Sequence, residues 1–69
     1  MSNVKLQRAH AMKANLIANA FSVAAGHFAA QGFSHDAKTC EQSAAEWRKS
    51  RSDWEAMANR TESNQMELL

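Results

Sequence analysis

The first helix predicted by the sequence is apolar on two separate faces. At about 100° per residue, side chains three or four positions apart line one stripe, which consists of Leu6, Ala14, Ile17, Phe21, Ala24 and Phe28. A second stripe, roughly a third of a turn away, consists of Met12, Leu16, Ala20, Val23 and Ala30. Because each stripe packs against one neighbour, this pattern predicts two neighbours for the helix.

The chain has one clear break in its helical pattern, at Gly32-Phe33-Ser34. Gly32 suits the left-handed residue that ends a helix, and Ser34 suits the cap of the next one. We therefore expect helices at about 3–31 and 35–60, with a turn at 32–34 and a frayed tail at 61–69. At the start of the chain, Ser2 or Asn3 can cap the first helix.

The second predicted helix has only one apolar stripe. It consists of Cys40, Ala44, Trp47, Trp54, Met57 and Ala58, and the opposite side of the helix is charged or polar. Two helices of similar length joined by a short turn predict an all-α, antiparallel helical hairpin over residues 1–60. Because the first helix needs two neighbours, we expect the hairpin to dimerise into a four-helix bundle with that helix at the centre.

Two sets of side chains on the first helix are candidates for these contacts. The predicted dimer and core residues are Leu16, Ile17, Phe21, Val23 and Phe28. Between the two stripes lie small side chains that permit close helix approach, as in an alanine-rich bundle interior: Ala11, Ala18, Ser22, Ala25 and Ala29. Whether the dimer is parallel or antiparallel stays open at this point.

Size and charge narrow the cellular setting. A chain of 69 residues has a marginal core of its own, and Cys40, its only cysteine, excludes an internal disulfide. A lone cysteine suits a reducing cytoplasm. The stretch from Ala14 to His35 carries no formal charge, but it is too rich in alanine and polar residues for a membrane span. We therefore expect a cytoplasmic protein without a cleaved signal.

The charges are distributed unevenly along the chain. Residues 1–35 contain three bases and no acid, whereas the remainder contains seven acids and five bases, so the two parts carry +3 and −2 and the total is +1. Opposite signs favour pairing of the two helices. The small net charge argues against bulk attraction to nucleic acid or membranes.

The sequence offers few groups for catalysis. The conventional candidates are His10, His27, His35 and Cys40, and their spacing matches no zinc motif. There is no glycine-rich phosphate loop and no pair of carboxylates near a predicted pocket. We predict a protein that is not an enzyme and that holds no metal or cofactor.

The segment from Trp47 to Trp54 is the densest in side chains that bind proteins. Trp and Arg dominate binding hot spots, so the predicted protein-binding set is Trp47, Arg48, Lys49, Arg51 and Trp54. Two tryptophans seven residues apart are also typical of a helix core, and the three bases can equally pair with neighbouring acids on a solvated face. Both interpretations stay open.

The polar side of the first helix is a rival surface. It carries Lys5, Arg8, Asn15, Asn19 and Ser22, flanked by Gln7 and Lys13. Two such helices in a dimer could form a basic ridge that fits a folded RNA, although so few charges offer few phosphate contacts.

At the level of architecture, residues 3–60 resemble the small hairpin proteins encoded by plasmids and phages. These include the RNA-binding Rop dimer and helical anti-activators that sequester host regulators. The resemblance implies an accessory protein that acts by binding. We predict a protein-binding module that inhibits or modulates a larger host protein, such as a transcription regulator, by masking its surface. The alternatives are a Rop-like RNA-binding dimer and a purely structural oligomerisation unit.

Overall fold

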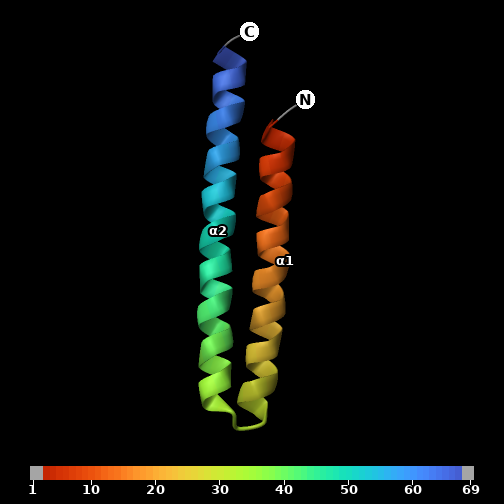
Figure 1. Ribbon diagram of the computed structural model, residues 1–69, viewed down its shortest axis with the longest axis vertical. Coiled ribbons are helices and arrows are strands. Elements are labelled where there is room, and N and C mark those ends of the chain that lie inside the picture. Colours follow the sequence, from red (N-terminus) through yellow and green to blue (C-terminus); the bar gives the residue numbers. More distant parts are fainter. Residues whose placement is uncertain (1–2, 68–69) are drawn as a thin grey trace.

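Two long helices joined by a short turn account for residues 3–67, the part of the chain that the computed structural model describes. Helix α1 is Asn3–Ala30 and helix α2 is Ser34–Glu67. They run side by side in opposite directions and form a rod of 57 × 15 × 10 Å (Figure 1). This confirms the predicted all-α antiparallel hairpin. The candidate cap Ser2 lies outside the described residues.

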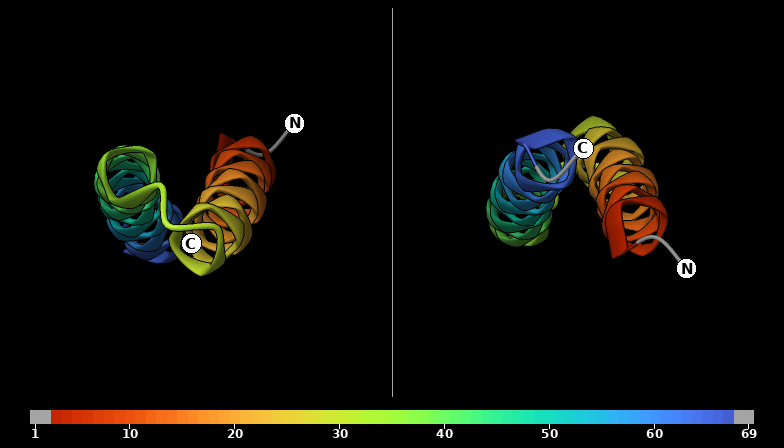
Figure 2. Two further views of the ribbon diagram at one scale, coloured as in Figure 1. Left: turned by 90° about the horizontal axis from the view of Figure 1, so that it is seen from below. Right: turned by 90° about the horizontal axis from the view of Figure 1, so that it is seen from above.

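The side chains between the helices recur at alternating spacings of three and four residues, and we call these positions the seam. On α1 they are Val4, Gln7, Ala11, Ala14, Ala18, Phe21, Ala25 and Phe28. On α2 they are Ala37, Cys40, Ala44, Trp47, Arg51, Trp54, Ala58 and Thr61. This is the spacing of a coiled coil, in which the helices wind around each other. Figure 2 shows the two helices inclined to each other when viewed along the rod.

Alanine dominates the centre of the seam. Among the described residues, every fully buried side chain except Val4 is an alanine, and Ala18 and Ala58 have 0% exposure. Because the distance between helix axes depends on the side chains at the contact, alanine lets the two backbones approach closely. No large side chain of the described residues is fully enclosed. The hairpin is therefore held by close helix contact rather than by a core of large apolar groups.

The position of α2 differs from the one the two-stripe pattern predicted. We expected α2 to cover one complete stripe of large residues. It packs instead over a seam that shares Ala14, Phe21 and Phe28 with the first stripe and otherwise consists mostly of the alanines beside it, so that Ile17 is only half-buried at the edge of the seam. Leu6, which we assigned to the same stripe, is 60% exposed. The alanine-rich face of α1 packs against α2 because small side chains allow the two helices to approach more closely than large ones do.

Gly32 ends α1 as predicted. It has a φ of 84°, in the left-handed region, and its N–H donates to the carbonyl of Ala29 at 3.1 Å. The N–H of Phe33 donates to the carbonyl of Phe28 at 2.9 Å, and the rings of these two residues meet edge to face, with centroids 6.4 Å apart. These bonds and the ring contact form a Schellman motif, which closes the last turn of α1 and starts the reversal of the chain.

The start of α2 corrects the predicted cap. The carbonyl of Phe33 accepts the first helical hydrogen bond, from the N–H of Ala37 at 3.0 Å. Phe33 therefore occupies the cap position and Ser34 is the first residue of the helix. Asp36 lies in the first turn, where its negative charge faces the positive end of the helix dipole.

The end of α2 lies beyond the predicted limit of about residue 60. The helix continues to Glu67, and its last turn projects beyond the N-terminal end of α1 (Figure 1). Arg8 of α1 forms an ion pair with Glu62 at 3.4 Å, and Thr61 lies half-buried in the seam. The hydroxyl of Thr61 also donates to the carbonyl of Met57 at 3.0 Å. Part of the predicted tail is thus helical, and residues 68–69 lie outside the described part of the chain.

The two glycines provide a matched test of the turn. Nothing lies within 4 Å of a Cβ added at either position, so backbone conformation alone decides the effect. Gly32→Val forces a β-branched residue into the left-handed region and should destabilise the hairpin by about 1–3 kcal/mol. Gly26→Ala, in the middle of α1, should stabilise it by up to about 1 kcal/mol. Thermal melts followed by circular dichroism would measure both, and equal melting temperatures would contradict this account of Gly32.

Candidate functional site

The tryptophans of the predicted binding segment face α1. Trp47 and Trp54 are both half-buried at seam positions. The ring of Trp54 stacks on His10 of α1, with ring centroids 4.5 Å apart and an interplanar angle of 24°. The structure therefore places these rings in the contact between the two helices, as the core interpretation of their spacing expected.

The arginines of the same segment also contact α1. Arg48 donates a hydrogen bond to the hydroxyl of Ser22. Arg51 donates to the side-chain oxygen of Asn15 at 3.3 Å, and its Nε lies 3.9 Å from the carboxylate of Glu55. These bonds join the two helices along one side of the seam.

Lys49 differs from the other members of the predicted set. It forms an ion pair with Asp53 at 3.0 Å, one turn along α2, and both side chains are mostly exposed. Such a pair on a solvated face contributes little to stability. The structure thus brings Trp47, Arg48, Arg51 and Trp54 to the helix contact and leaves Lys49 outside it.

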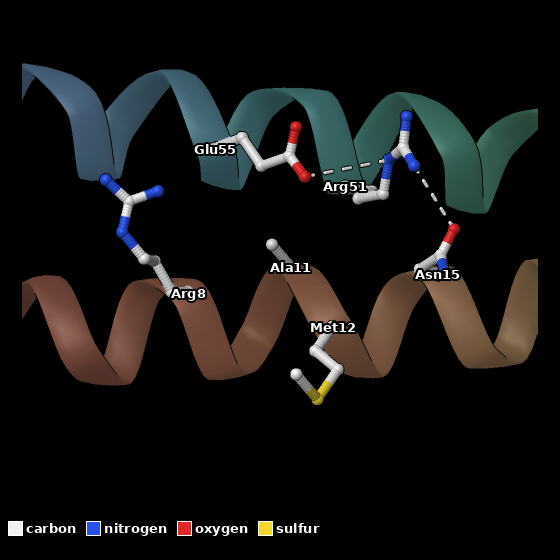
Figure 3. A pocket seen from close by; sticks show the side chains of 6 residues that line it. All are labelled: Arg8, Ala11, Met12, Asn15, Arg51 and Glu55. Atoms are coloured by element: carbon white, nitrogen blue, oxygen red, sulfur yellow. Dashed lines mark hydrogen bonds and ion pairs between the residues drawn. The ribbon is translucent and has the colours of Figure 1, made fainter.

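The contacts made by Arg8, Arg48 and Arg51 form a polar edge on one side of the hairpin. A shallow groove of about 280 Å³ lies within this edge, lined by Arg8, Ala11, Met12, Asn15, Arg51 and Glu55. Figure 3 shows Asn15 and Arg51 reaching toward each other, whereas Met12 is directed away from α2. At its other end, Arg8 donates to Asn59 at 3.2 Å and pairs with Glu62. The charged side chains of this groove are thus paired across the helices or along α2.

A second surface of α1 has no such partners, and we call it the outer face. It lies opposite the seam and contains Leu6, Ala9, Met12, Leu16, Ala20, Val23 and Ala30. The four large members, Leu6, Met12, Leu16 and Val23, are 60–67% exposed. Apart from Leu6, and from Ala9, which we did not assign to a stripe, these residues form the second predicted stripe.

The two helices therefore differ in their outward surfaces. The side of α2 that faces away from α1 is exposed and mostly polar or charged, with Lys38, Gln42, Glu46, Lys49, Ser52, Asp53 and Arg60. Of the predicted dimer and core residues, Leu16 and Val23 lie on the outer face of α1, Phe21 and Phe28 are half-buried seam residues, and Ile17 is half-buried beside the seam. Only α1 combines a seam on one side with a row of large exposed apolar groups on the other.

The polar residues proposed for RNA contact are largely engaged within the hairpin. Arg8, Asn15 and Ser22 are bonded to α2, and Gln7 is a half-buried seam residue. Lys5, Lys13 and Asn19 are exposed. Two exposed lysines offer few phosphate contacts on a single hairpin, and the predicted basic ridge requires two hairpins.

The candidate chemical groups are dispersed over the hairpin. Cys40 is half-buried in the seam, His27 is exposed and His10 stacks on Trp54. Within residues 3–67, no group of three or more His, Cys, Asp or Glu side chains could hold a metal ion. Neither described helix is long and apolar enough to cross a membrane.

The sequence contained a signal for the seam in the seven-residue spacing of alanines. Ala11, Ala18 and Ala25 fall at one seam position of α1, and Ala37, Ala44 and Ala58 fall at one position of α2. Those of α1 belong to the small residues that the sequence predicted to permit close helix approach, whereas Ala37 was not assigned to the apolar stripe of the second helix. Comparison with known proteins adds no assignment, because no family model, curated protein or solved structure matches the chain.

The contacts of Arg51 predict a stability effect. Arg51→Ala removes the hydrogen bond to Asn15 and the pair with Glu55, and should lower the free energy of unfolding by about 0.5–1.5 kcal/mol. Lys49→Ala removes an exposed pair on the same helix and should change it by less than about 0.5 kcal/mol. Chemical denaturation of the two variants would measure the difference. Equal stabilities would show that the polar edge does not hold the helices together.

Proposed function

We propose that this chain is a non-catalytic protein-binding module that acts by covering a surface of another protein. The outer face of α1 is the contact surface. The observation that carries the proposal is the exposure of Leu6, Met12, Leu16 and Val23 on a single face of one helix. Contiguous exposed apolar groups on a small chain mark an interaction surface.

The distribution of apolar groups supports this location over the tryptophan segment. Trp54 already stacks on His10 of α1, Trp47 is half-buried, and Arg48 and Arg51 bond to α1, so binding through them would disturb the hairpin. The outer face makes no comparable contact within the hairpin. A helix that presents Leu16, Val23 and their neighbours at spacings of three and four residues suits an apolar groove or another helix.

We further propose that the target is a larger protein, such as a transcription regulator, whose surface the module masks. The groove of the polar edge supports a role in binding rather than in catalysis, because its lining provides paired charges and no hydroxyl, thiol or imidazole. An RNA ligand is the competing outcome, and binding that depends strongly on salt and is lost on ribonuclease treatment would favour it.

Paired substitutions on the two helices test the contact surface. Leu16→Ser with Val23→Ser should reduce partner capture at least tenfold, because both large groups are lost from the outer face. Helicity should persist, because neither residue lies in the seam. Capture can be measured with tagged chain in an extract of the cells that produce it, followed by quantitative mass spectrometry.

The matched control is Ala45→Ser with Ala56→Ser, two exposed residues of α2. This variant should retain both helicity and capture. If the α1 variant captures its partner as well as the parent chain does, the proposed surface is wrong. A loss that appears equally in both variants would also contradict it.

A further inference from the structure

The hairpin exposes more surface than a compact chain of its size. Its accessible surface is 5298 Å², whereas a compact folded chain of 7.7 kDa exposes about 4,300 Å². The Cα radius of gyration is 16.1 Å, against about 11 Å for a compact chain of this length. The excess area, roughly 1,000 Å², is close to the ~800 Å² that each partner buries in a stable protein interface.

The exposed residues on the outer side of α1 also follow a regular spacing. Together with the exposed residues Lys13 and His27 on the same side of α1, most members of the outer face follow one another at alternating spacings of three and four residues: Leu6, Ala9, Lys13, Leu16, Ala20, Val23, His27 and Ala30. This is a second coiled-coil pattern on the same helix, and every member is exposed. A pattern of this kind fits another helix of similar length better than it fits a flat surface.

Resting on the proposed function of the outer face, we infer that a second copy of this chain occupies it when no target is bound, so that self-pairing and capture of a larger protein compete for the same surface. The α1 helices of the two copies pair antiparallel, about a two-fold axis that passes beside Ala18. In this register, each residue of one α1 faces the residue of the other α1 whose number brings the sum of the two residue numbers to 36. Leu16 then faces the partner's Ala20, and Leu6 faces the partner's Ala30.

Side-chain size supports the antiparallel register. Each leucine of the outer face meets an alanine of the other copy, Ala9 meets the imidazole of His27, and Val23 packs beside the aliphatic part of Lys13. A parallel pair would place Leu16 against the partner's Leu16 and Ala20 against the partner's Ala20. Such a contact would be crowded at one level and hollow at the next, and both defects are destabilising.

Charge supports the same choice. The three bases of α1 all lie in its N-terminal half, and the helix carries no acid. A parallel pair would bring Lys5 and Lys13 beside their own copies. An antiparallel pair separates them and places Lys5 near the C-terminal end of the partner's α1, which carries the negative end of the helix dipole.

The resulting dimer has a defined order of helices. Because the outer face lies opposite the seam, α1 is the inner helix of each hairpin and α2 is the outer one. The four helices lie side by side, α2–α1–α1–α2, which is flatter than a square four-helix bundle. The polar outward side of α2 faces solvent in this arrangement.

Disulfide trapping between two variants of the full chain tests the register. In a Cys40→Ser background, one variant carries Ala9→Cys and the other His27→Cys, both on the exposed outer face. The register places residue 9 opposite residue 27 of the other copy. An equimolar mixture under mild oxidation should give at least tenfold more mixed disulfide than either self-disulfide, as measured by mass spectrometry. The parent chain should sediment at micromolar concentration with twice its 7.7 kDa mass.

Other outcomes overturn the inference. Dominant self-disulfides would indicate a parallel pair, a statistical mixture would indicate non-specific contact, and a dimer without the mixed product would exclude this register. A monomeric parent chain would exclude self-pairing altogether.

The proposed function would be contradicted by a different result, in which the loss of Leu16 and Val23 leaves capture of a larger protein unchanged. A monomer that still captures such a target through the outer face would overturn only the self-pairing.

Discussion

Close contact between two alanine-lined helix faces is the constraint on which the rest of the hairpin depends. Ala18 and Ala58 are fully enclosed, and larger side chains at these positions would force the backbones apart. The close approach of the two helices brings Arg48 within hydrogen-bonding distance of Ser22 and allows His10 to stack on Trp54. The polar edge and the aromatic stack are therefore consequences of the small residues at the centre of the seam.

The same constraint limits how much stability the hairpin generates alone. Buried alanine removes little apolar area from water, and the hydrophobic contribution scales with that area. Two buried polar atoms of the seam, Gln7 Oε1 and Arg51 Nε, lack hydrogen-bond partners, which adds a cost. Large apolar groups such as Leu16 remain exposed on the outer face. Much of the apolar surface of the chain therefore lies on the outer face, where only contact with another molecule can remove it from water.

The sequence predicted the hairpin well because its turn is specified locally. Gly32 supplies the left-handed residue, and Phe33 supplies the apolar contact that completes the motif. The sequence also predicted that α2 covers only one of the two stripes, and the structure shows that the second stripe is the uncovered one, since Leu16 and Val23 are exposed. These features depend on one residue or on one helix, so periodicity and backbone preference suffice to find them.

Features that depend on both helices were harder to predict. The choice of the alanine-rich seam, which includes Phe21 and Phe28 but leaves Ile17 beside it and Leu6 exposed, follows from the fit between two surfaces, which hydrophobicity along one helix does not describe. Beyond residue 60, α2 contacts α1 through Glu62, which pairs with Arg8, 54 positions away along the chain. Arg51 illustrates the same limit. Its type suggested a hot spot for a foreign protein, whereas its place in the seam directs it to Asn15 of its own chain.

For a hairpin with so small a core, any molecule that covers the outer face of α1 would also stabilise the fold, because binding to the folded state alone shifts the folding equilibrium. Folding and binding in this chain are thus connected through a single helix.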